Sequence, residues 1–131
     1  MSKNVAESEI QKWLDVRKVS DKKRELYSDT ISELVTAVEE GRLTVEDDGT
    51  LVQKLEFPMG ENKSIVTLRF APRVTIYDVR QATSALNAKA NDPDARLIAY
   101  IAASTKMAVN VVQRLDTIDY STSTNIALFF L

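Results

Sequence analysis

The chain has 131 residues, the size of one ordinary domain, and its formal net charge of −2 gives no global field for nucleic acid or an anionic membrane. Its composition, 44% hydrophobic and 27% charged, excludes a disordered chain, a fibre and a membrane protein. Because cysteine and histidine are both absent, disulfides and thiolate metal sites are excluded, and the commonest general base is missing. We therefore expect no cofactor and no metal.

The helix-breaking residues are gathered in one part of the chain. All three glycines and all three prolines lie between Gly41 and Pro93, which predicts helices, then a turn-rich insert, then more helices. We expect one α+β domain, mostly helical, with a small three-stranded antiparallel meander inserted between its N-terminal and C-terminal helices. The helices cover 1–40 and 75–131, and the meander covers 42–70.

The N-terminal part predicts a short amphipathic helix followed by a longer one. Ser20 is the expected N-cap of the second helix, and Gly41 is expected to end it in a left-handed conformation. The first helix carries apolar residues at helical spacing, namely Ala6, Ile10, Trp13 and Leu14. The second carries the clearest such stripe in the chain, namely Tyr27, Ile31, Leu34, Val35 and Val38.

The middle of the chain has the pattern of β-strands. Residues 42–45 and 50–55 alternate in polarity on either side of a turn that contains Asp48 and Gly49, which is a strong hairpin signal. A looser turn at 58–62 is expected to lead to a third strand at 64–70. One face of this meander should pack on the helices.

The C-terminal part predicts further helices. Thr75 opens a helix with a capping box, and that helix is expected to run to about Ala90 with an inward stripe of Val79, Ala82 and Leu86. Asp92 and Pro93 start the next helix as N-cap and first helical residue.

The helix that begins at Pro93 has an unusual apolar segment. Residues 97–103 are apolar on every side, which places this helix in the middle of the fold. Ser104 and Thr105 are expected to break it, and Asp116 is expected to cap a last helix.

Two charged runs have a bland and a functional interpretation. Glu46-Asp47-Asp48 lacks the alternating ligands of a calcium loop, so a solvated turn is favoured. Lys22-Lys23-Arg24 could contact phosphate, but it lies in an acidic part of the chain, so an exposed helix face is favoured.

The sequence offers little for catalysis. Asp116 and Asp119 are three residues apart, as paired carboxylates can be, but capping and the helix dipole explain them better. The hydroxyls of residues 121–124 have no histidine to activate them, and neither standard glycine-rich phosphate loop occurs. We expect a protein that is not an enzyme.

Both ends of the chain are rich in large apolar residues. They can dock on the core, or they can form a patch for a partner, because aromatic anchors dominate interface energies. The candidate partner-binding residues are Ile10, Trp13, Leu14, Leu128, Phe129, Phe130 and Leu131.

The sequence over about residues 34–131 resembles the tail assembly chaperones of long-tailed (siphovirus-type) bacteriophages. The resemblance is a pattern of apolar positions and aspartates. It departs from the family at Ser104-Thr105-Lys106, where relatives often have a glycine after the apolar helix. The residues that carry it are 40–45, 47–51, 73–80, 97–103, 115–119 and 129–131.

This resemblance implies a non-catalytic role in building the tail. Such proteins bind the tape measure protein, keep it soluble and help tail tube protein to polymerise around it, and many self-associate. It implies a protein of the host cell cytoplasm that is absent from the mature virion and binds neither membrane nor nucleic acid. The alternatives are a structural tail or head-tail connector subunit and a small nucleic-acid-binding regulator.

Overall fold

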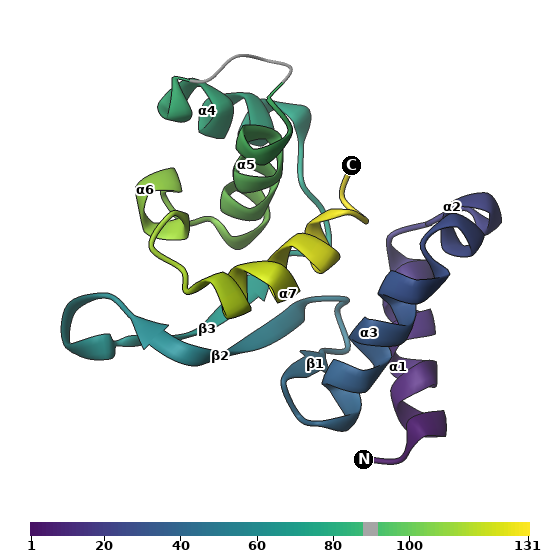
Figure 1. The fold of residues 1–131 in the computed structure, drawn as a ribbon. Coiled ribbons are helices and arrows are strands. Elements are labelled where there is room, and N and C mark those ends of the chain that lie inside the picture. The colour runs from purple at the N-terminus through teal and green to yellow at the C-terminus, as the bar shows by residue number, and fades with distance from the viewer. Residues whose placement is uncertain (88–91) are drawn as a thin grey trace.

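The computed structural model describes residues 1–87 and 92–131, and it confirms an α+β arrangement in which a three-stranded sheet separates the N-terminal from the C-terminal helices along the chain (Figure 1). The helices are α1 (Lys3–Val16), α2 (Asp21–Leu26), α3 (Ser28–Glu39), α4 (Ile76–Leu86), α5 (Pro93–Thr105), α6 (Val109–Val112) and α7 (Thr117–Ala127). The strands are β1 (Leu43–Val45), β2 (Leu51–Met59) and β3 (Ile65–Phe70), with a 3₁₀ turn, η1 (Glu61–Lys63), before β3. None of the described helices is long and apolar enough to cross a membrane.

The N-terminal helices begin and end close to where the sequence predicts. The Ser20 hydroxyl accepts a hydrogen bond from the Lys23 amide, so Ser20 is the N-cap as expected. The predicted long helix is divided into α2 and α3, because Tyr27 has a non-helical backbone with φ −107° and ψ 30°. Gly41 follows α3 with φ +77°, which confirms the predicted left-handed end.

The sheet is an antiparallel meander with the order β1-β2-β3, as predicted. Gly49 has φ +91°, and a Cβ atom there would lie 2.7 Å from Val16 Cγ1, so both the turn and the packing of α1 require glycine. The second strand runs to Met59, past the predicted start of the turn. Its register with β3 shifts between Lys54 and Met59, so that this irregular part accommodates Pro58.

The C-terminal helices also have the predicted caps. Thr75 caps α4 and Asp92 caps α5. α4 ends at Leu86, earlier than predicted, because Asn87 is left-handed; residues 88–90 of the predicted helix and Asn91 of the predicted stop lie outside the described residues.

The end of α5 differs slightly from the prediction. Ser104 and Thr105 do not break the helix, since their hydroxyls bond back to carbonyls of the preceding turn. The helix ends one residue later at Lys106, whose φ of +58° is the conformation that glycine adopts most easily.

The helices form two groups that meet on α7 (Figure 1). α1 packs on α3 at one side, α5 contacts α4 and α6 at the other, and α7 touches α3, α5 and β2. Every residue of the apolar segment 97–103 is buried or half-buried, which confirms the predicted central place of α5. The largest fully buried side chains are Trp13, Phe70, Ile10, Leu14, Leu34, Leu43, Leu51, Leu68, Ile101 and Ile126.

Candidate functional site

The apolar residues at the two ends of the chain dock on the core, which is one of the two interpretations that the sequence left open, and they do not form an exposed patch. Five of the seven candidates are buried in the core, Leu128 is half-buried, and Leu131 is 41% exposed. The reason is that the N-terminal and C-terminal segments cover each other. The five buried candidates are Ile10, Trp13, Leu14, Phe129 and Phe130.

The contact between the two ends is aromatic. The Trp13 ring meets Phe129 edge-on with centroids 5.7 Å apart, and Phe130 lies 6.4 Å from it. The Arg17 guanidinium lies 3.4 Å above the centre of the Phe130 ring and donates from Nε to the Phe129 carbonyl at 3.1 Å. This contact stabilises the fold and buries those rings as long as the two ends of the chain stay packed together.

A groove of about 570 Å³ lies on the other side of the molecule, between α4, α5 and α6. Its apolar lining comes from all three helices and from the connection between α5 and α6. The lining residues are Asp78, Gln81, Ala82, Ala85, Ala102, Ala103, Lys106, Met107, Ala108, Val109 and Asn110.

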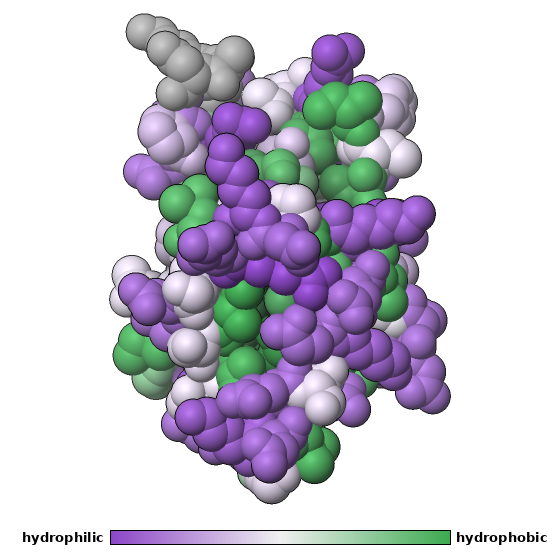
Figure 2. Space-filling view, turned by 90° about the vertical axis from the view of Figure 1, so that its right-hand side faces the viewer, coloured by the Kyte–Doolittle hydropathy of each residue, from purple (hydrophilic) through white to green (hydrophobic). Residues whose placement is uncertain are grey.

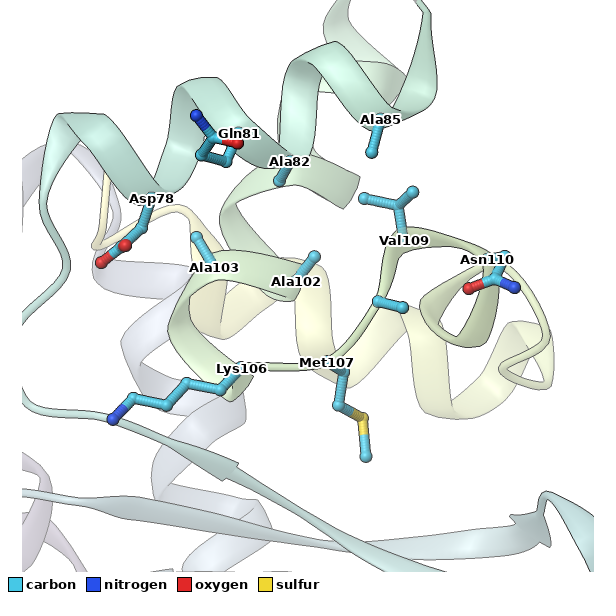
Figure 3. Close-up of a pocket in the computed structure, with 11 residues that line it drawn as sticks. Asp78, Gln81, Ala82, Ala85, Ala102, Ala103, Lys106, Met107, Val109 and Asn110 are labelled. Atoms are coloured by element: carbon cyan, nitrogen blue, oxygen red, sulfur yellow. The ribbon is translucent and has the colours of Figure 1, made fainter.

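The groove exists because most residues that line it are small. In Figure 3 the methyl groups of Ala82 and Ala102 and the side chain of Val109 face the space between the helices. An alanine in place of a larger residue leaves the facing helix without a partner side chain, and the gap that remains is open to another molecule.

The rim of the groove is polar and is charged at one end. Asp78 and Lys106 lie toward the same end, while Asn110 lies at the other (Figure 3). All three of these side chains are exposed. An apolar lining with a polar rim is the anatomy of a surface that binds protein.

Further exposed apolar side chains lie at the start of α4. Ile76 is 62% and Tyr77 67% exposed, and they immediately precede Asp78 at the rim. By contrast, the face that carries α1 to α3 is mostly hydrophilic, with hydrophobic residues showing chiefly inside a narrow hollow and as separate spots (Figure 2). A hollow between α1 and α3 is lined by Ile31 and Val35 among polar residues.

The two charged runs are used within the protein. Glu46 pairs with Arg69, Asp47 pairs with Lys12, and Asp48 accepts from the Thr50 amide, so the three acidic side chains turn to different partners. Hydrogen bonds to the Thr50 backbone and side chain lower the pKa of Asp48. No group of three or more acidic residues in the described part of the chain could hold a metal ion.

The basic run is likewise engaged. Arg24 donates to Asp15 and to Gln11, and Lys23 donates to the carbonyl of Leu131 at 2.8 Å. These bonds favour the interpretation of an ordinary helix face over that of a phosphate site.

Asp116 and Asp119 have different roles, although the sequence suggested the same one. Asp116 caps α7, as predicted. Asp119 is only 2% exposed, and its two carboxylate oxygens accept from the amides of Glu56 and Phe57 at 2.8 and 3.0 Å. It thus holds the irregular part of β2, where the ladder to β3 is interrupted.

The sequence reasoning missed the groove. The one available signal was the abundance of alanine in the predicted helices that became α4 and α5. Ala82 was expected to face inward, and it does so only in part, because it lines the groove. No family model, curated protein or solved structure matches the chain.

Proposed function

We propose that this protein is a tail assembly chaperone of a long-tailed bacteriophage, which binds the tape measure protein without catalysis and keeps it soluble. The observation that supports this best is the open, alanine-lined groove between α4, α5 and α6. The resemblance over residues 34–131 supplies the identity of the client.

The groove suits a helical client. An amphipathic helix binds a groove by inserting large apolar side chains at helical spacing, and small residues in the groove let it approach closely. Met107 adds a flexible side chain that can adapt to different client residues. Several apolar stretches of one long client could therefore be bound in turn.

Reversible binding is sufficient for such a role. By mass action the chaperone lowers the concentration of free client and so slows aggregation. We propose that it acts in the host cell cytoplasm as a homo-oligomer, that tail tube protein replaces it as the tube polymerises, and that it is absent from the mature virion.

The test is co-expression with the candidate tape measure protein. The wild-type chain should make this client soluble and co-purify with it. Ala85→Leu should weaken both effects, because the larger side chain takes up part of the groove. Ser84→Leu is the matched control, since Ser84 is the exposed neighbour of Ala85 on α4 and does not line the groove.

The outcomes separate the site from the function. A client that stays insoluble with the wild-type chain contradicts the chaperone proposal. A client that is solubilised equally by both variants contradicts the groove as its binding site. Mass spectrometry of purified particles distinguishes a chaperone, which should be missing, from a structural tail subunit, which should be present.

A further inference from the structure

Residues 128–131 form a short segment, here called the strap, that follows α7 and lies against the N-terminal helices. The backbone amides of Leu128, Phe129 and Phe130 donate only turn hydrogen bonds to the last residues of α7. What binds the strap is the cleft beneath it, which is lined by aromatic rings. Phe129 contacts Trp13 and Tyr27, and Phe130 contacts Trp13 and Phe70.

The tryptophan that contacts the strap carries a polar group that is unsatisfied while the strap is in place. The indole Nε1 of Trp13 is buried and has no hydrogen-bond partner within the described part of the chain. Buried polar groups are nearly always paired in native proteins, and an unpaired one opposes the burial that surrounds it. The strap is therefore held less tightly than its aromatic contacts alone would suggest.

The two cations beside the strap, Arg17 and Lys23, donate to backbone carbonyls and not to carboxylates among the described residues. Arg17 donates to the carbonyls of Phe129 and Pro72, and none of the ion pairs among the described residues includes it. Burial, and next the charge of Arg73, lower the pKa of Arg17 to about 10, so it remains charged at neutral pH. Burial and the charge of Arg17 also lower the pKa of Lys23, which donates to Leu131.

We propose that the strap is a displaceable cover, and that an apolar client segment bearing aromatic side chains takes its place in the cleft beside Trp13. Phe129 and Phe130 show what the cleft accepts, namely two aromatic rings with backbone carbonyls turned toward Arg17 and Lys23. A client segment of that kind replaces each contact by an equivalent one. The proposal rests on the proposed function only for the identity of the client.

The replacement of the strap by a client segment has a physical reason to be reversible. When the strap leaves, the Trp13 indole can donate to water or to a client carbonyl, which the strap does not provide. The lost aromatic contacts are regained with the client. The cleft thus gives the chaperone a second apolar surface that is covered until a client is present.

Hydrogen exchange of the Trp13 indole tests the opening without any client. Trp13 is the only tryptophan, so its Nε1–H gives a single resonance. We expect it to exchange at least about tenfold faster than the amide of the buried Ile101, with little dependence on low urea, because local openings expose little surface. Equal rates with equal urea dependence would show that the strap opens only on global unfolding, and would overturn the proposal.

A peptide tests the occupant. A synthetic copy of residues 126–131 should bind the full chain and shift the fluorescence of Trp13, and the same peptide with both phenylalanines replaced by serine should not. Phe130→Ala should strengthen binding of the first peptide by about tenfold, because the intramolecular competitor is weakened. Leu34→Ala is the control, since Leu34 is also buried but belongs to α3 and not to the strap.

Absence of peptide binding to both the wild-type chain and Phe130→Ala would overturn the proposal, as would an equal gain in Leu34→Ala. Peptide binding by a chain that fails to solubilise the tape measure protein would leave the strap proposal standing and refute the function. The two proposals can therefore fail separately.

Discussion

The two sides of the molecule are built from helices of similar length but pack in opposite ways. On the side of α1 and α3, large side chains pack into the core, and Trp13, Leu14 and Leu34 are almost fully buried. On the side of α4 to α6, alanines face each other across a groove of about 570 Å³. α4 buries only Val79.

This difference separates stability from binding. Buried apolar area stabilises the fold, and α1 and α3 contribute eight residues to the core cluster whereas α4 to α6 contribute three. The α4 side is stabilised less, but its open groove can accept another molecule. The contrast also explains why the largest apolar residues of the sequence form no exposed patch, since they are the residues that the fold needs for itself.

Truncating one isoleucine on each side of the molecule should give the largest difference in the free energy of unfolding. Ile10→Ala removes a fully buried side chain from α1 and should lower the free energy of unfolding by about 2–5 kcal/mol. Ile98→Ala removes the same atoms from a half-buried position on α5. It should lower the free energy of unfolding by less than about 2 kcal/mol, because water can enter the space that is left. Urea unfolding measures both, and equal losses would refute the contrast.

The junction of the two sides should show an intermediate effect. Asp119→Ala leaves the amides of Glu56 and Phe57 without their acceptor and should cost about 1–3 kcal/mol. Asp116→Ala removes only a helix cap and should cost about 1 kcal/mol. If guanidinium unfolding gives the same loss for both variants, the buried carboxylate of Asp119 does not hold β2.

The smallest effect is expected beside the groove. Lys106 has a left-handed backbone at the end of α5, and Lys106→Gly removes the strain of a side chain in that conformation. The strain removed exceeds the conformational entropy that glycine loses on folding, so the free energy of unfolding should rise by about 0.5 kcal/mol. Thr105→Gly, one residue earlier and inside the helix, should lower it by about 1 kcal/mol. Thermal unfolding can rank the two variants, and a loss in both would show that Lys106 is not strained.

Local signals predicted most helix starts and turns. Ser20, Thr75, Asp92 and Asp116 all cap the helices that they were expected to cap. These predictions succeeded because a cap or a tight turn is decided by a few neighbouring residues.

The errors arose where distant contacts override the local pattern. Asp119 looks like an ordinary first-turn aspartate, but β2 supplies two amides that bury it. Pro58 looks like part of a turn, but the shifted register lets it lie within β2. The sequence left the place of the two apolar ends open for the same reason, since nothing near Trp13 in the sequence shows that Phe129 covers it.

The sequence by itself determined the α+β class, the central place of α5 and the order of helices and strands, because hydrophobic periodicity and helix-breaking residues act over a few positions. Only the tertiary structure decided which apolar residues are free for a partner. That choice depends on which segments cover each other, and segments as far apart in sequence as α1 and the strap meet only when the chain has folded.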